Sequence, residues 1–291
     1  MTEGRDFQPF EAAERAEISE SMLAFLGELK EILLSGFGPE PAGSRAERLG
    51  QIHEPSFSQG PYPGRNAMET ALFATLAGVD HAQAVAHALR SPDLSFSLAT
   101  LTRGAVESYG RAWWLIEPED DDELIVRWLS GLVSELSQFE KVNPGGILTE
   151  LRGRNSDVES EMPRLLDEIE HRTKSRKPLS ISYTRLATQL VDQIGANGRY
   201  QYSHLSGVAH GESMGHHGFV EVDDVNGVYR VGLDERWGIS YARQTFAASS
   251  FVGKKMLALL GRTVNPGHPC AVAHDRAADL IWTAKARVFK E

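Results

Sequence analysis

Apolar residues recur at steps of three and four along most of this chain, the period of helices that bury one face. Between residues 10 and 36 the apolar positions include Ile18, Met22, Phe25 and Leu29, and the pattern ends at a segment rich in glycine and proline. This stretch predicts one amphipathic helix. The same period predicts further helices over about 66–90, 95–116, 121–141, 156–174, 183–194, 199–210, 241–260 and 269–291.

Two segments break the helical period. Residues 53–65, HEPSFSQGPYPGR, hold three prolines and two glycines and are expected to form an irregular connection. Residues 218–232, GFVEVDDVNGVYRVG, alternate apolar and polar side chains about Asn226 and Gly227, a pair that favours the positive φ angles of a tight turn. The second segment therefore predicts a two-stranded ribbon of about four residues a side.

Together these elements predict an all-α fold, a multi-helix bundle of about eight to ten helices with one small β-hairpin near residues 218–232. A chain of 291 residues can bury a large core without disulfides or metal. We expect one domain over residues 1–291, with an N-terminal helical part (1–60), a core bundle (66–217), the hairpin, and C-terminal helices (240–291). No internal repeat is visible in the sequence, which excludes a solenoid.

The composition indicates the cellular compartment in which the protein is expected. No run of about 18 apolar residues without charge occurs, which argues against a membrane partner. The first residues are acidic and lack an apolar core, so they do not resemble a secretory signal. The single cysteine, Cys270, excludes an internal disulfide and a thiolate cluster for structural zinc. We therefore expect a cytoplasmic protein.

The charge balance bears on the partners. The chain carries 40 acidic and 30 basic residues, a formal net charge of −10. Phosphate affinity depends on Lys and Arg side chains that displace counterions, so this balance argues against nucleic acid. We interpret the densest basic cluster as the cationic end of a helix; it comprises Arg172, Lys174, Arg176 and Lys177. A small-molecule ligand is the expected partner, and assembly into a homo-oligomer stays open.

One polar stripe lies on the helix predicted to end near His210. It comprises Arg199, Tyr202, Ser206 and His210, which at about 100° per residue fall within an arc of about 80°. Gly211 allows the chain to leave the helix directly after His210. A histidine there, with hydroxyl groups one and two turns away, suits acid–base chemistry or phosphate binding. The alternative is a hydrogen-bonded polar seam between buried helices.

A second stripe lies on the apolar segment SLATLTRGAVESYGRAWWLI, and it comprises Arg103, Glu107, Gly110 and Trp114. An unpaired charge in so apolar a segment would be costly, so we expect Arg103 and Glu107 to pair with each other or with the first stripe. Gly110 in mid-helix indicates close approach of another backbone or a ligand. Trp113 and Trp114 cannot face the same way. We favour core packing for both, and the alternative is that one walls a pocket.

Motifs for metals and phosphates are weak. Asp120, Asp121, Asp122 and Glu123 could hold Mg²⁺ for a diphosphate substrate, but such a run more commonly caps the next helix, and we favour the cap. Walker and Rossmann patterns are absent. Ser213 lies in a Gly-x-Ser-x-Gly match, but between a helix and a predicted hairpin instead of at the strand-to-helix turn of a hydrolase. We therefore expect no metal and no cofactor.

The segments LTRGAVESYGRAWWLIEPE and YSHLSGVAHGE carry an R-x-x-x-E helix that runs into A-W-W-L and, later, Y-x-x-x-S-x-x-x-H-G. In these motifs the chain resembles a group of bacterial, often actinobacterial, helical proteins that look distantly similar to HEPN domains. Many HEPN domains are RNA-cleaving toxins or phage-defence effectors. The resemblance implies a cutting motif of an arginine with a histidine four to six residues further on, a spacing that Arg199 and His204 match.

Our leading hypothesis is a small-molecule enzyme with a buried polar site between the two stripes. His210 is the candidate general acid or base, and Tyr202 and Ser206 are its candidate hydrogen-bond partners. Glu107 and Arg103 would orient a polar or anionic substrate group. The candidate substrate-binding residues are Arg103, Arg199, His204, Trp113 and Trp114.

Three alternatives stay open. A HEPN-like ribonuclease would use Arg199 and His204, although an ideal helix places these two about 140° apart, whereas His210 shares the stripe of Arg199. A non-catalytic ligand-binding or interaction protein would use both stripes structurally. A Mg²⁺-dependent, diphosphate-processing terpene cyclase, which we rank lower, would use the carboxylate run 120–123.

Overall fold

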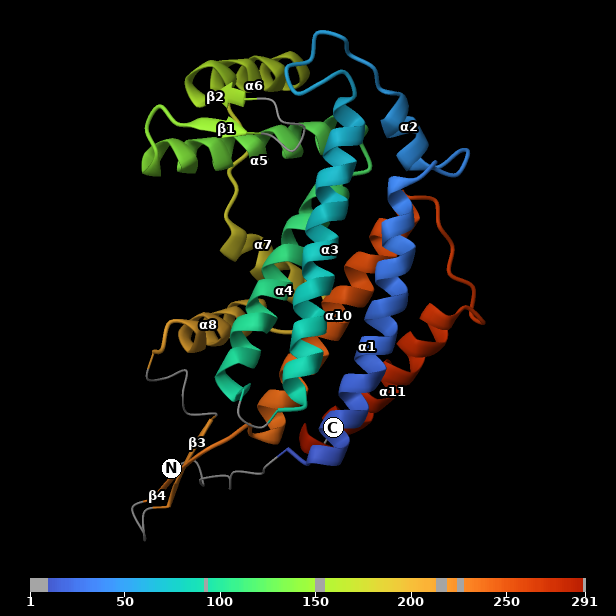
Figure 1. Ribbon diagram of the computed structural model, residues 1–291, viewed down its shortest axis with the longest axis vertical. Helices are drawn as coiled ribbons and strands as arrows, with labels where there is room; N and C mark the ends of the chain where they lie inside the picture. The colour runs from blue at the N-terminus through green and yellow to red at the C-terminus, as the bar shows by residue number, and fades with distance from the viewer. Residues whose placement is uncertain (1–9, 92–93, 150–154, 213–218, 224–227, 290–291) are drawn as a thin grey trace.

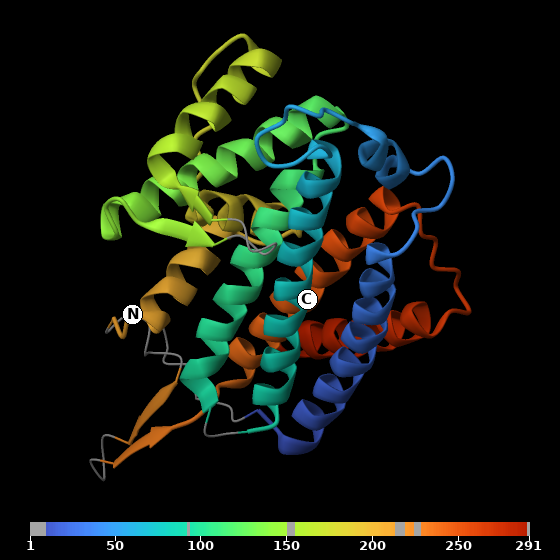
Figure 2. The same cartoon turned by 45° about the horizontal axis from the view of Figure 1, so that its top comes forward.

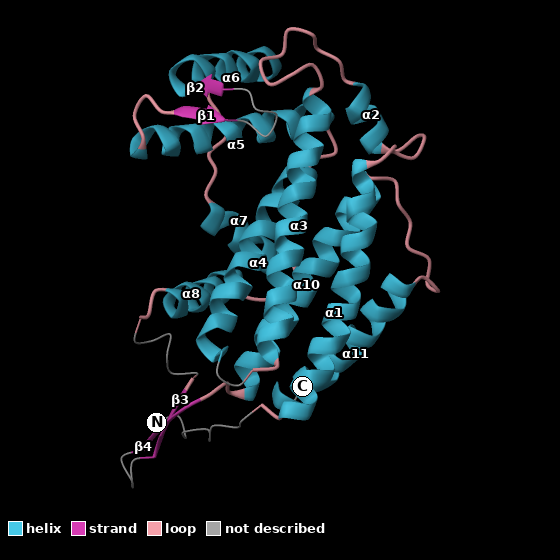
Figure 3. Ribbon diagram, viewed as in Figure 1, coloured by secondary structure: helices cyan, strands magenta, loops and turns pink. Residues whose placement is uncertain are grey.

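The computed structural model describes residues 10–91, 94–149, 155–212, 219–223 and 228–289 of the chain. These residues are helical almost throughout (Figures 1 and 3), which confirms the all-α multi-helix bundle. The described α-helices are α1 (Ala12–Leu34), α2 (Arg45–Gln51), α3 (Pro63–Leu89), α4 (Ser95–Ile116), α5 (Asp121–Val142), α6 (Val158–Thr173), α7 (Tyr183–Gln193), α8 (Gly198–Ala209), α10 (Glu235–Leu259) and α11 (Pro269–Phe289).

The described residues also include four short strands. β1 (Ile147–Thr149) and β2 (Asn155–Asp157) pair antiparallel between α5 and α6, where no strand was expected. β3 (Val220–Asp223) and β4 (Val228–Val231) pair antiparallel within the segment expected to form a ribbon. The predicted turn, residues 226–227, lies outside the described residues.

Helices α3 and α4 run side by side through the middle of the molecule (Figures 1 and 2). α10 packs against both, α1 packs against α3, and α11 packs against α1 and α10. α7 and α8 pack against α4, while α5 and α6 lie across the upper end in Figure 1. One hydrophobic cluster includes residues from α1 through to α11. The charged stripe of α4 therefore meets α8 instead of bulk solvent.

Short polar residues decide where two of these helices begin. Asn197 accepts a hydrogen bond from the Tyr200 backbone N–H at 3.0 Å and caps α8. Asp234 caps α10 in the same way, so this helix begins at Glu235 and not near Tyr241 as the apolar period predicted. Trp237 is the only large apolar residue in the first turn of α10, too few to display an apolar period.

The connection before α3 is irregular over residues 52–62, as its prolines predicted. α3 begins at Pro63 and not near Asn66, because a proline in the first turn lacks only an N–H that would have no helical partner. α2 was not predicted, since its seven residues are too few to display a period. None of the described helices combines the length and the apolar character that crossing a bilayer requires.

Candidate functional site

The polar edges of α4 and α8 face each other. Arg103 on α4 donates from Nε to Oε1 of Glu107, 2.8 Å away and one turn later on the same helix. Tyr202 on α8 donates its hydroxyl to the same carboxylate oxygen at 2.6 Å. Arg103 and Glu107 thus pair with each other, as their spacing predicted, and Glu107 also pairs with the other stripe. One carboxylate joins two helices that are distant in sequence.

The surroundings of this carboxylate keep both of its partners protonated. The hydrogen bond to Glu107 is the main cause that raises the pKa of Arg103. Burial, followed by the hydrogen bond to Glu107, raises the pKa of Tyr202. The Arg103 guanidinium also lies over the Tyr202 ring, 5.6 Å from its centroid. At neutral pH the cluster therefore holds a guanidinium, a carboxylate and an intact phenol.

His210 extends the cluster at the end of α8. Its Nε2 lies 3.2 Å from Nη1 of Arg103. A guanidinium can only donate hydrogen bonds, so Nε2 is the acceptor in this contact, which corresponds to the tautomer with its proton on Nδ1. His210 is the C-terminal cap of α8, and Gly211 follows with a φ of 69°, a left-handed conformation that suits glycine. The chain leaves the helix there, as predicted, and His210 remains exposed.

A groove of about 600 Å³ lies beside His210. Its walls come from the first half of α4 and from the residues on either side of His210 in the chain. The α4 residues precede Arg103 by one to two turns, so the groove and the charged cluster belong to the same pair of helices. The lining residues are Phe96, Ser97, Thr100, Leu101, Val208, Ala209 and Gly211.

Two members of the predicted stripe on α8 stand apart from the charged cluster. Arg199 is exposed in the first turn of α8, and within the described residues its side chain has no hydrogen-bond or ion-pair partner. Ser206 is half-buried, and among the described residues its hydroxyl has no partner either. The structure thus brings Tyr202 and His210 to Arg103, but leaves Arg199 outside the cluster, about one turn before Tyr202 and three turns before His210 along the helix.

His204 faces a different helix. Its Nε2 lies 2.7 Å from the Tyr241 hydroxyl on α10, and its ring stacks on Trp237 at a centroid distance of 3.7 Å. Burial lowers the pKa of His204 to about 4. The side chain is therefore a neutral, packed imidazole at neutral pH. Its contacts are with α10, whereas Tyr202 and His210 contact α4.

Gly110 marks a close approach between α4 and α7. A Cβ added there would lie 3.1 Å from the backbone N of Ala187 and 3.1 Å from the carbonyl carbon of Leu186. The glycine thus admits another backbone, one of the two reasons predicted for it. The same approach brings Thr184 of α7 to 3.4 Å from the Tyr202 hydroxyl. The sequence offered no sign that Thr184 would join the cluster, because the contact depends on how α7 docks.

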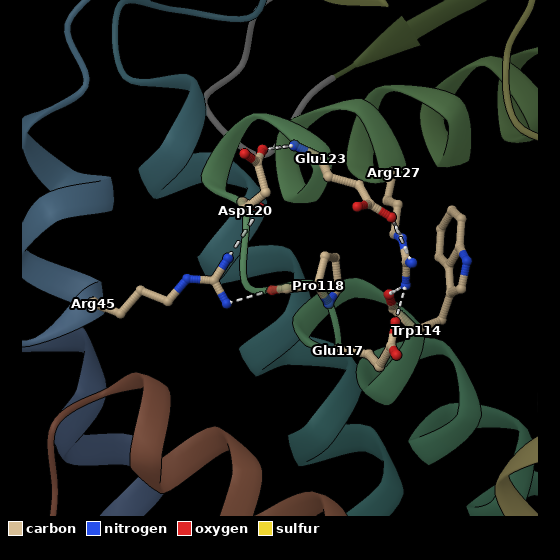
Figure 4. Close-up of polar contacts among 7 residues, drawn as sticks. All are labelled: Arg45, Trp114, Glu117, Pro118, Asp120, Glu123 and Arg127. Atoms are coloured by element: carbon tan, nitrogen blue, oxygen red, sulfur yellow. Dashed lines mark hydrogen bonds and ion pairs between the residues drawn. The ribbon is translucent and has the colours of Figure 1, made fainter.

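The two tryptophans lie at the far end of α4. Both are half-buried and pack against the core, so the interpretation favoured from the sequence, core packing alone, describes only part of their surroundings. Both also line a second groove of about 520 Å³, together with Arg127. The Arg127 guanidinium lies over the Trp114 ring, 5.5 Å from its centroid (Figure 4). Eleven residues of helix, about 16 Å, separate Trp114 from Arg103, so this groove is distinct from the one at His210.

The carboxylates that follow α4 are all engaged. Asp120 accepts from the backbone N–H of Glu123 at 2.8 Å and caps α5, which confirms the cap interpretation (Figure 4). Asp121 pairs with Arg45, Asp122 pairs with Arg172, and Glu123 pairs with Arg127. No group of three or more metal-ligating side chains occurs among the described residues. Ser213 lies outside them.

Comparisons of the chain with models of protein families, with curated proteins and with solved structures found no match. The relationship to HEPN-like helical proteins therefore stays a prediction. A fold of this class hosts many unrelated activities, so function has to be argued from the site itself. The candidate site with the most converging polar groups is the cluster of Arg103, Glu107, Tyr202 and His210.

Proposed function

We propose that this protein is a small-molecule enzyme in which His210 exchanges a proton with a substrate that Arg103 holds. One contact carries the proposal: Arg103 Nη1 lies 3.2 Å from His210 Nε2, beside a groove on the same two helices. Since the guanidinium can only donate, this contact presents a histidine lone pair next to a fixed positive charge. Those are the two groups that an acid–base enzyme needs for an anionic substrate.

The substrate class follows from Arg103. A carboxylate or phosphate group would compete with His210 for the guanidinium, because arginine binds such anions through parallel hydrogen bonds. Binding would free Nε2 beside the bound molecule, where it can accept a proton and later return it. Ser206 offers a hydroxyl on the same face of α8.

Glu107 and Tyr202 are positioning residues in this proposal. Glu107 accepts from Arg103 at 2.8 Å and from Tyr202 at 2.6 Å, so it fixes the guanidinium between α4 and α8. It also balances the charge of Arg103 before a substrate binds. A second anion beside Glu107 is most favourable if His210 takes up a proton at the same time.

Each alternative function relies on different residues or on a different use of Arg103. A HEPN-like ribonuclease would need Arg199 and His204 to act on one phosphodiester, yet Arg199 is exposed and His204 stacks on Trp237 against α10. A non-catalytic ligand-binding protein would use Arg103 in the same way but would not convert its ligand. The terpene-cyclase alternative relies on carboxylates that cap α5 or pair with arginines.

The test has a binding part and a turnover part. Thermal shifts with inorganic phosphate and acetate at constant ionic strength probe anion binding. Incubation with pooled small carboxylates and phosphate esters, followed by ¹H NMR, probes turnover. Variants Arg103→Met and His210→Gln are compared with His87→Gln, an exposed histidine on α3.

We expect anions to raise the melting temperature of the wild type and of His87→Gln, and to have little effect on Arg103→Met. We expect His210→Gln to lower turnover by about 100-fold or more while anion binding persists. Turnover that survives His210→Gln would contradict the acid–base role. Anion binding without turnover of any compound favours the ligand-binding alternative, and RNA cleavage that is lost in His204→Gln favours the ribonuclease.

A further inference from the structure

A groove on the other side of the molecule lies between α1, α10 and α11. Its volume is about 510 Å³, within the range of sites for small organic ligands. Apolar side chains from all three helices form most of its walls. They include Phe25 and Leu29 of α1, Leu257 of α10 and Ala271 of α11, and the loop between α10 and α11 adds Val264 and Pro266. Such walls suit an apolar group of a ligand. The polar side chains that also line this groove are therefore candidates for reacting with that ligand.

Three of those polar side chains form a chain of hydrogen bonds. Ser250 Oγ on α10 lies 2.8 Å from Nε2 of His274 on α11. Nδ1 of the same imidazole lies 2.9 Å from Oδ1 of Asp275. All three residues line the groove. Ser250 and His274 come from different helices, so the arrangement exists only in the folded chain.

The direction of these bonds follows from hydrogen-bond chemistry. A carboxylate only accepts, so Nδ1 of His274 carries the proton and donates to Asp275. In the neutral ring Nε2 then has the lone pair, and the hydroxyl of Ser250 is the donor to it. This is the tautomer in which a histidine can remove the proton of a serine nucleophile while a carboxylate orients the ring.

The local surroundings hold this arrangement in place. The His274 ring packs edge-on against Phe25, with centroids 5.3 Å apart, and is tilted against Phe246, with centroids 5.1 Å apart. Its side chain is only 19% exposed. Ser249, the neighbour of Ser250, donates to the carbonyl of Thr245 in its own helix at 2.7 Å, as helical serines commonly do. Ser250 instead directs its hydroxyl to a side chain on another helix.

We infer that Ser250, His274 and Asp275 form a second active site, which hydrolyses carboxylic esters that have a short apolar acyl group. Ser250 Oγ would bond to the ester carbonyl carbon and pass its proton to His274 Nε2, which gives it to the departing alcohol. Water then attacks the acyl-serine, and its proton returns through His274 to Ser250. The net reaction is ester plus water to acid plus alcohol.

Two other residues of the groove fit this reaction. Lys254 lies one turn after Ser250 on α10 and lines the groove, so its ammonium is available to the oxygen that becomes negative during attack. Cys270 also lines the groove, but burial raises the pKa of its thiol, which leaves it a poor nucleophile at neutral pH. The serine is therefore the nucleophile that the groove presents.

The test uses an alkyl fluorophosphonate, which bonds covalently to activated serines, followed by peptide mapping by mass spectrometry. Hydrolysis of p-nitrophenyl butyrate is the second readout. The variants are Ser250→Ala, His274→Gln and Asp275→Asn. Ser160→Ala is the matched control, because Ser160 is exposed on α6 at the other end of the molecule. His210→Gln separates this site from the one proposed above, on which it does not depend.

We expect the label on Ser250 of the wild type, of Ser160→Ala and of His210→Gln. His274→Gln is expected to lower labelling and hydrolysis by at least about 100-fold, and Asp275→Asn by about tenfold because Asp275 is largely exposed. If Ser250→Ala does not fold, protection of wild-type Ser250 by p-nitrophenyl butyrate replaces it. Absence of label, label on another residue such as Ser213, or hydrolysis unchanged in His274→Gln would overturn the proposal.

Discussion

His204, His210 and His274 share one side chain but have different partners. His204 stacks on Trp237, His210 accepts from a guanidinium, and His274 lies between a serine and a carboxylate. Burial lowers the pKa of the first, whereas the hydrogen-bond partners of the other two favour one tautomer of each ring. Residue type alone therefore does not assign a role to a histidine in this chain.

The buried imidazole of His204 should make stability depend on pH. Burial lowers its pKa to about 4 in the folded chain, below the value of about 6.5 for a free imidazole. Between these values the unfolded chain takes up a proton that the folded chain does not. The contribution of neutral His204 is thus fully present above about pH 6.5 and is lost as the pH falls towards 4, by on the order of 1–3 kcal/mol.

Urea unfolding of the wild type and of His204→Gln at pH 7.5, 6.0 and 5.0 measures this dependence. We expect the unfolding free energy of the variant to fall less steeply with decreasing pH. His87→Gln, which changes an exposed histidine, should keep the wild-type slope. Equal slopes for the wild type and His204→Gln would show that folding does not lower the pKa of His204.

At the scale of elements, the docking of α7 on α4 positions part of the candidate site. Gly110 admits the α7 backbone, and Thr184 of α7 lies 3.4 Å from the Tyr202 hydroxyl. Gly131 on α5 is also buried in a helix, but a Cβ added there would have nothing within 4 Å. These two glycines therefore form a matched pair for separating helix propensity from packing.

We expect opposite effects from alanine at the two glycines. Gly131→Ala should raise the unfolding free energy by up to about 1 kcal/mol, because alanine favours the helix and meets no neighbour. Gly110→Ala should lower it by about 1–2 kcal/mol, since its Cβ would press on rigid backbone of α7 and outweigh the gain in propensity. Chemical denaturation measures both changes. A stabilised Gly110→Ala would mean that α7 moves aside without cost.

At the scale of the whole molecule, ion pairs connect segments that are distant in sequence. Arg172 at the end of α6 contacts Glu54 of the irregular connection and Asp122 of α5. Its side chain is 7% exposed and its guanidinium lies over the Phe57 ring, 5.9 Å from the centroid. The position of Arg172 at a helix end was predicted. Its ion pairs, which connect α6 to α5 and to the irregular connection, depend on tertiary packing.

Removing the ion pairs of Arg172 should make the connection over residues 52–62 unfold locally more often. We expect Arg172→Met to lower the unfolding free energy by about 1–3 kcal/mol and to speed thermolysin cleavage within that segment. Arg176→Met, which removes an exposed pair with Asp167, should change stability by less than about 0.5 kcal/mol. If cleavage of residues 52–62 is the same in both variants, Arg172 does not hold the segment.

Local spacing predicted most of the helices, but it failed where an element is short or begins with polar residues. α2 has seven residues and β1 and β2 have three each, too few for a period to emerge. The first turn of α10 was missed because a polar cap and not an apolar stripe marks its start. In each case a helix cap or a strand pair defines the element, and an apolar period reveals neither.

The sequence by itself determined which side chains share a helix face, because that follows from about 100° of rotation per residue. It thereby predicted that Arg103 and Glu107 pair with each other or with the other stripe, and the acidic run that includes Asp120 predicted the cap of α5. Only the tertiary structure decided which helix each face meets. His204 contacts Tyr241 of α10, and Ser250 of α10 contacts His274 of α11. Such contacts join residues far apart in the chain and arise from packing of the whole core, which no local period encodes.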